Sequence, residues 1–85
     1  MRVRFRSAAE KALERIPADR RRQILSRIGQ VAADPAARGT GVVPLAGSDL
    51  LRLRVGDYRV LFSVDEGEQM LTVELIRTRG DIYKR

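Results

Sequence analysis

Apolar and polar positions along the chain change their period twice, and these changes predict the order of the elements. Val3 and Phe5 alternate with three arginines, a spacing of two that predicts a short strand. Apolar residues then recur at helical spacing over residues 8–16 and again over 24–32. From Leu50 onward the period returns to two. The expected order is β-α-α-β-β-β, which defines an α+β fold with a small, mainly antiparallel sheet.

The two helices are expected to form a hairpin that turns at Pro17. Ser7 and Glu10 have the spacing of a capping box, in which each side chain satisfies a backbone amide at the start of the helix. The second helix should end at Asp34-Pro35. It carries one apolar stripe, formed by Ile24, Leu25, Ile28, Val31 and Ala32. This stripe should pack on the sheet.

The C-terminal half predicts three antiparallel strands. Gly56-Asp57 is a two-residue hairpin loop between two alternating segments. The third strand runs over residues 70–77. Before Arg77 it is apolar on both faces apart from Thr72 and Glu74, so it should be interior. Residues 34–49 are rich in glycine and proline and predict a loop, with a short extended piece at Val42-Val43. One face of the meander should be buried, through Leu51, Leu53, Val55, Tyr58, Val60, Phe62 and Val64.

If the helices cover that apolar face, Arg52, Arg54 and Arg59 project from the opposite, open face. The short loop should place Arg54 opposite Arg59 at roughly 5 Å, with Arg52 diagonal to Arg59 at roughly 7–8 Å. Like charges on neighbouring strands repel, so these arginines would tolerate each other best around an anion such as phosphate. The alternative is that they pair with acidic neighbours, namely Glu74, Asp57 or Glu68.

Composition narrows the possible chemistry. The 85 residues carry a net charge of +6, and among the 17 basic residues only Lys11 and Lys84 are lysine. This balance favours nucleic acid or an acidic protein as a partner. The chain has no cysteine and no histidine, which excludes disulfides and Ser-His or Cys-His nucleophiles. We expect no metal and no cofactor. With no apolar run long enough for a membrane and no signal peptide, a cytoplasmic protein is expected.

The C-terminal tail holds a second group of candidates. Tyr83 precedes Lys84 and Arg85, and Arg77 and Arg79 lie shortly before it. A phenol near arginines can orient a hydroxyl, stack on a base or transfer a proton; the alternative is that it packs on the core. Strict alternation gives Arg79 the parity of Val73 and Leu75. It would then lie on the helix side unless the strand ends or twists near residues 78–80.

Two segments carry a resemblance to a known family. Residues 53–62 read LRVGDYRVLF, and residues 79–85 read RGDIYKR. Together with the helical hairpin around Leu13-Glu14-Arg15-Ile16-Pro17, they resemble the RelE/ParE superfamily of bacterial toxins over nearly the whole chain. The resemblance implies one RelE/ParE-like toxin domain over residues 1–85. It also implies a toxin of a type II toxin–antitoxin system, bound in a hetero-oligomer by an acidic antitoxin.

The superfamily has two main activities. RelE-like members are ribosome-dependent endonucleases that cut mRNA and stop translation, whereas ParE-like members poison DNA gyrase without catalysis. The resemblance favours a metal-independent endoribonuclease for this chain, with ribosome and mRNA as partners. Two alternatives stay open: a gyrase poison, and a basic nucleic-acid-binding module without catalysis.

The resemblance also implies roles for individual residues. Arg59 would hold the scissile phosphate, Arg79 would stabilise developing charge or assist the leaving group, and Tyr83 would position or deprotonate the 2′-hydroxyl. These three are the expected catalytic residues. The expected RNA- or phosphate-binding residues are Arg52, Arg54, Arg77, Lys84 and Arg85.

The sequence departs from the family pattern at three places. The first basic residue of the strand pair is replaced by Leu50 or Leu51, a frequent lysine is Arg52, and a frequent histidine is Thr78. Arginine keeps its proton and is a poor general base. We therefore expect electrostatic stabilisation and positioning to supply most of any rate enhancement.

Overall fold

A computed structural model describes residues 1–34 and 41–78. The elements follow the expected order, with one additional short strand at the position of the predicted extended piece. They are β1 (Arg2–Phe5), α1 (Ser7–Glu14), α2 (Ala18–Ala33), β2 (Val42–Pro44), β3 (Leu51–Val55), β4 (Tyr58–Asp65) and β5 (Met70–Thr78).

The strands form one five-stranded sheet in the order β1-β5-β4-β3-β2. The strands β2, β3, β4 and β5 form antiparallel pairs in sequence order, and β1 pairs with β5 in parallel. The predicted interior position of β5 is thus confirmed, since β1 lies on one side of it and β4 on the other. The connection between the two parallel strands is long, because the helical hairpin and three further strands separate β1 from β5 in the chain.

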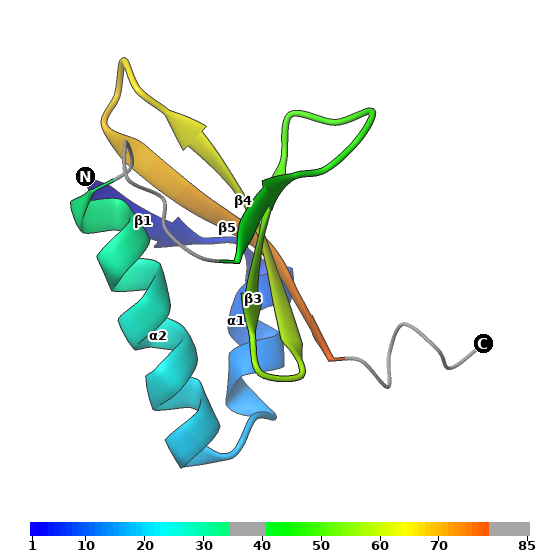
Figure 1. Ribbon diagram of the computed structural model, residues 1–85. Helices are drawn as coiled ribbons and strands as arrows, with labels where there is room; N and C mark the ends of the chain where they lie inside the picture. The colour runs from blue at the N-terminus through cyan, green and yellow to red at the C-terminus, as the bar shows by residue number, and fades with distance from the viewer. Residues whose placement is uncertain (35–40, 79–85) are drawn as a thin grey trace.

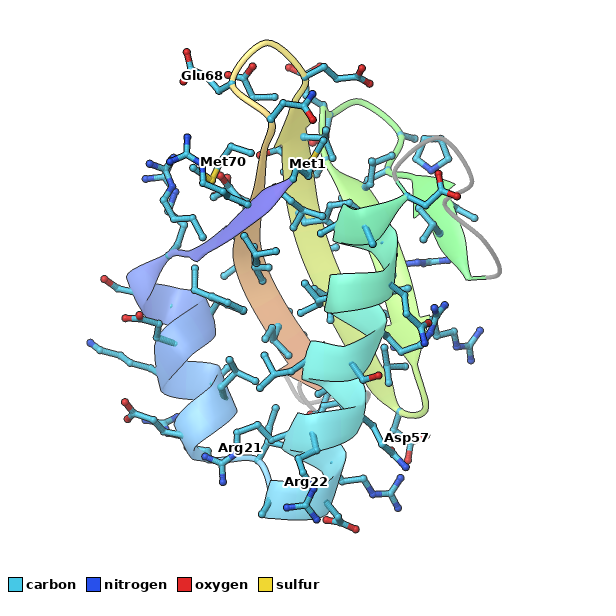
Figure 2. All side chains as sticks on the ribbon, turned by 90° about the vertical axis from the view of Figure 1, so that its left-hand side faces the viewer. Met1, Arg21, Arg22, Asp57, Glu68 and Met70 are labelled. Atoms are coloured by element: carbon cyan, nitrogen blue, oxygen red, sulfur yellow. The ribbon has the colours of Figure 1, made fainter. Side chains whose placement is uncertain are left out.

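Both helices cover the same face of the sheet. Figure 1 shows α1 and α2 on one side of the strands, with no described helix on the other, and Figure 2 looks at the sheet through the two helices. The core lies between these layers. It is formed by Ala9, Ile16, Ile24, Ile28, Val31, Ala32, Leu53, Val60, Phe62, Leu71, Val73 and Ile76. The predicted apolar, helix-covered face is therefore confirmed, and so is the place of Arg52 and Arg59 on the opposite face.

One irregularity corrects the expected alternation along β5. Leu61 pairs with Leu75, but Phe62 pairs with Val73, so Glu74 is an extra residue opposite β4. Such a bulge shifts the side-chain parity on one strand. Val73 and Leu75 therefore do not share a face: Val73 is in the core, whereas Leu75 pairs on the open face. The parity argument that set Arg79 on the helix side is wrong, and Arg79 itself lies outside the described residues.

Two details of the helices also differ from expectation. The capping box is not formed: Arg6 is the N-cap of α1, no side chain caps the helix, and the Glu10 amide donates to the Arg6 carbonyl at 3.0 Å. The physical reason is the short connection, because Arg6 still pairs with β5 and the helix begins at Ser7. Leu25, expected in the buried stripe, is 40% exposed.

Within residues 1–34 and 41–78, none of the helices has the length and apolar character needed to cross a lipid bilayer.

Candidate functional site

A pocket of about 320 Å³ opens on the sheet face that the helices leave uncovered. Three adjacent strands contribute one arginine each: Arg52 from β3, Arg59 from β4 and Arg77 from β5. Leu61 of β4 and Leu45, from the segment between β2 and β3, complete the lining. We call this set of five residues the arginine pocket.

The register of the strands explains why these side chains meet. The two-residue turn, with Gly56 at φ 57°, pairs Val55 with Tyr58 and so sets Arg52 opposite Leu61. A positive φ of this size favours glycine. On the other side of β4, Arg59 pairs with Arg77. The arginines at 52, 59 and 77 therefore come from neighbouring positions on one surface of the sheet.

Among the described residues, no carboxylate lines the arginine pocket. Glu74, which lies on the open face of β5, instead pairs with Arg6 at 3.3 Å and accepts a hydrogen bond from the Ser63 hydroxyl at 3.4 Å. In the described part of the chain, Arg52, Arg59 and Arg77 form no ion pair. The alternative that acidic neighbours neutralise these arginines is thus not what this structure shows.

Arg52 carries a further sign of incomplete pairing. Its Nε is buried and makes no hydrogen bond within the described structure. A buried donor without an acceptor is costly, and such groups are rare in folded proteins. An anion bound between the arginines is one acceptor that would offset this cost.

Arg54 lies apart from the pocket. Its backbone pairs with Arg59 as expected, but its side chain lines two cavities beside α2 instead. On the side of β3 away from β4, the residue next to Arg54 is Gly41, whose carbonyl accepts a hydrogen bond from the Arg54 amide at 3.1 Å. Because glycine has no side chain, it leaves this sheet edge open toward α2. Arg54 is therefore not grouped with Arg52 and Arg59 in one pocket.

The remaining predicted site residues, Arg79, Tyr83, Lys84 and Arg85, lie outside the described residues. The two leucines of the pocket were not singled out from the sequence. Leu61 did carry a signal, because it is an apolar residue on the otherwise polar face of β4. Leu45 lies in a glycine-rich loop, where no periodicity indicates direction.

The pocket can bind and stabilise negative charge. Guanidinium groups offer planar forks of donors that match phosphate and carboxylate oxygens. They keep their protons across the physiological range, so they are poor acids and bases. Within residues 1–34 and 41–78, no group of three or more acidic side chains gathers where a metal could bind.

A family model described as the ParE toxin of the type II toxin–antitoxin system parDE matches residues 3–83. The chain therefore belongs to the ParE toxin family, within the RelE/ParE superfamily, and is a toxin of a type II toxin–antitoxin system. No curated protein matches it.

Solved structures give the same superfamily. RelE in the archaeal RelE–RelB complex of Pyrococcus horikoshii is 31% identical, with a TM-score of 0.79 over 93% of this chain and 94% of that one. The YoeB/ParE toxin of Agrobacterium tumefaciens is 24% identical, with a TM-score of 0.78 over 92% and 98%. The RelBE2 toxin–antitoxin complex of Mycobacterium tuberculosis gives 21% identity and a TM-score of 0.78 over 92% and 96%. The predicted superfamily and fold are thus confirmed.

Proposed function

We propose that this toxin is a ribosome-dependent mRNA endonuclease that acts in the cytoplasm and cuts RNA in the arginine pocket. The observation that supports this most directly is that three adjacent strands each contribute an arginine to one pocket, with no carboxylate among its described lining residues. A structural role would not require three like charges on adjacent strands, because they repel each other. A phosphodiester bound between them would offset that repulsion.

The reaction we propose is an internal transfer within the RNA. The 2′-oxygen attacks the adjacent 3′-phosphorus, the bond from phosphorus to the 5′-oxygen breaks, and a 2′,3′-cyclic phosphate forms. A base takes the 2′-hydroxyl proton, and an acid supplies a proton to the departing 5′-oxygen. Negative charge grows on the phosphoryl oxygens in the transition state, where fixed positive groups are most effective.

Each residue has a proposed part in this reaction. Arg59, on the middle strand, holds the scissile phosphate, and Arg52 and Arg77 bind it from either side. Arg79 stabilises the charge on the leaving side, and Tyr83 positions or deprotonates the 2′-hydroxyl. The other tail residues, Lys84 and Arg85, contact the RNA backbone.

The partner that controls this activity is, in our proposal, an acidic antitoxin that forms a hetero-oligomer with the toxin. Two observations support it. The chain has a net charge of +6, and the structural neighbours include RelE toxins solved in complex with RelB antitoxins. An acidic segment that orders on the toxin would cover part of its basic surface.

A second candidate function is poisoning of DNA gyrase without catalysis. The family model that matches residues 3–83 is that of ParE, and one structural neighbour is a YoeB/ParE toxin. In this case substitutions in Arg20–Arg22 of α2 should affect toxicity more than substitution of Tyr83.

One induction experiment separates the two candidates. Wild-type chain, Arg59→Ala, Tyr83→Phe and the control Arg4→Ala are induced in cells, and transcript ends and gyrase-linked DNA breaks are mapped. For an endonuclease, new transcript ends appear with wild type and Arg4→Ala and disappear with the other two. DNA breaks without new transcript ends, or full toxicity of both Arg59→Ala and Tyr83→Phe, would contradict the proposal.

A further inference from the structure

A second basic cavity runs between α2 and the β3 side of the sheet. It consists of two adjoining hollows of about 560 and 610 Å³, which share Arg27, Arg54 and Gly56. We call it the α2–β3 groove. Figure 2 shows Arg22, which also lines it, at the same end of the molecule as Asp57 in the β3–β4 turn. The groove therefore extends from the hairpin turn along the side of α2.

Positive charge prevails in this groove. It is lined by Arg22, Arg27 and Arg54. The Arg20 side chain also lies near Gly56, with Nη1 at 3.9 Å from the position that a Cβ atom would occupy there. Among the described residues of the lining, Asp19 is the single acidic one, and its carboxylate accepts a hydrogen bond from the Arg20 amide at 2.9 Å. Within the described residues, Arg20, Arg22 and Arg54 form no ion pair.

The other groups that line the groove indicate what it binds. Beside the guanidinium groups stand amides and a hydroxyl, from Gln23, Gln30 and Ser26. Arg27 donates to the Gln30 side chain at 2.8 Å, which holds both groups in place. Val55 is the one large apolar residue among the described residues of the lining. Guanidinium, amide and hydroxyl groups are those that contact phosphate and sugar.

The β3–β4 hairpin joins this groove to the arginine pocket. Arg54 and Arg59 are directly opposite in the register, yet Arg54 lines the groove and Arg59 lines the pocket. Cα atoms of directly opposite residues in an antiparallel pair are about 4.5–5.5 Å apart. A strand of RNA that leaves the pocket past Arg59 therefore meets Arg54 next.

We propose that the α2–β3 groove binds the sugar–phosphate backbone of the same single-stranded RNA whose scissile phosphate occupies the arginine pocket. This inference rests on the proposed function for the identity of the strand. It adds a second binding region, which touches the RNA away from the point of cleavage and supplies affinity without base specificity.

The test is the dependence of affinity on RNA length. Two labelled single-stranded RNAs, of about 4 and about 16 nucleotides, are titrated with the full chain at several salt concentrations. The variant Arg22→Ala/Arg54→Ala should bind the long RNA roughly tenfold more weakly and reduce its salt slope by about 1.4, as two lost phosphate contacts predict. Its affinity for the short RNA should stay near that of wild type.

A matched control is Arg2→Ala/Lys11→Ala, which removes the same charge from exposed positions outside both cavities. The inference is overturned if this control lowers the affinity for the long RNA as much as the groove variant does. It is also overturned if the groove variant weakens both RNAs equally or neither. The same variants are also titrated with poly-glutamate. If the groove variant loses poly-glutamate binding but keeps RNA binding, the groove fits an acidic protein partner and the inference is overturned.

Failure of this inference can be told apart from failure of the proposed function. The length dependence is a binding measurement, whereas the proposed function is judged by transcript ends in cells. A groove variant with normal RNA binding overturns the inference and leaves cleavage in the pocket standing. If Arg59→Ala leaves cleavage undiminished, the proposed cleavage in the pocket is overturned, whereas the binding result for the groove stands.

Discussion

At one end of the sheet's open face, three arginines line a pocket without a carboxylate; at the other, two arginines share a depression with three acids. The second region, of about 230 Å³, contains Arg4, Arg6, Asp65, Glu68 and Glu74 among its lining residues. We call it the mixed-charge depression. Figure 2 marks the two ends of the strands by Asp57 and Glu68. Arginine charge is balanced by acidic residues in the mixed-charge depression and is not balanced by any described residue of the arginine pocket.

The comparison shows why arginine content alone does not locate a binding site. In the mixed-charge depression, Arg6 already has a protein partner in Glu74. In the arginine pocket, the Arg52 Nε has none in the described structure. Charge that the fold leaves unbalanced is the charge available to an external anion.

Neutralising one arginine in each region should give the largest difference. We expect Arg59→Gln to lower RNA cleavage in a translating extract by about 100-fold, because a fixed charge at the transition state is lost. The matched change Arg4→Gln should leave the rate nearly unchanged. Equal effects of the two substitutions would show that only net charge matters.

Of the two regions compared, only the arginine pocket should bind an added anion. Pyrophosphate at about ten times its dissociation constant for that pocket should raise the free energy of unfolding of wild type by about 1.4 kcal/mol. Arg77→Ala should lower this gain, and Arg6→Ala should keep it. Thermal unfolding with and without pyrophosphate measures both. A gain that survives Arg77→Ala but disappears with Arg6→Ala would reverse the assignment of the two regions.

The same pocket should be a site where stability and function conflict. Arg52→Met keeps an unbranched side chain as far as the ε position, but it removes a buried donor without a partner and one of three like charges. We expect the free energy of unfolding to rise by about 1 kcal/mol, while RNA cleavage falls. Urea denaturation measures the first quantity. A loss of stability would mean that Arg52 has a structural role.

The smallest effect is expected in the mixed-charge depression. Glu74→Gln removes the ion pair with Arg6, whose side chain is 60% exposed. Exposed pairs contribute little, so stability should fall by about 0.3 kcal/mol and less at high salt. Urea denaturation at two salt concentrations checks this. A stability gain, as predicted for Arg52→Met, would remove the distinction between the two ends.

The parts of the fold set by local pattern could be predicted from the sequence. The Gly56-Asp57 turn fixed the register of β3 and β4, and with it the pairing of Arg54 with Arg59. The helical stripe gave the part of the core that α2 contributes, Ile24, Ile28, Val31 and Ala32, since burial follows the helical period. Leu25 was the exception, because an apolar stripe indicates which side of a helix is buried but not how many positions on that side are covered.

What sequence could not give were features that depend on long-range pairing. The bulge at Glu74 arises between β4 and β5, and no local signal marked it. The side-chain direction of Arg54 depends on Gly41 and α2, which are distant in the chain. Ser7 has the chemistry of a cap, but the pairing of Arg6 with β5 decides where the helix begins.

The extra residue in β5 has a consequence for deletions in this strand. Val73 and Ile76 both lie in the core although three positions separate them, and Arg77 shares the surface with Arg59 only because the bulge absorbs Glu74. Deleting Glu74 would leave plain alternation, in which Val73 and Ile76 stay inward and Arg77 stays outward. A one-codon deletion would thereby straighten β5 and remove the ion pair with Arg6, yet leave the arginine pocket in place.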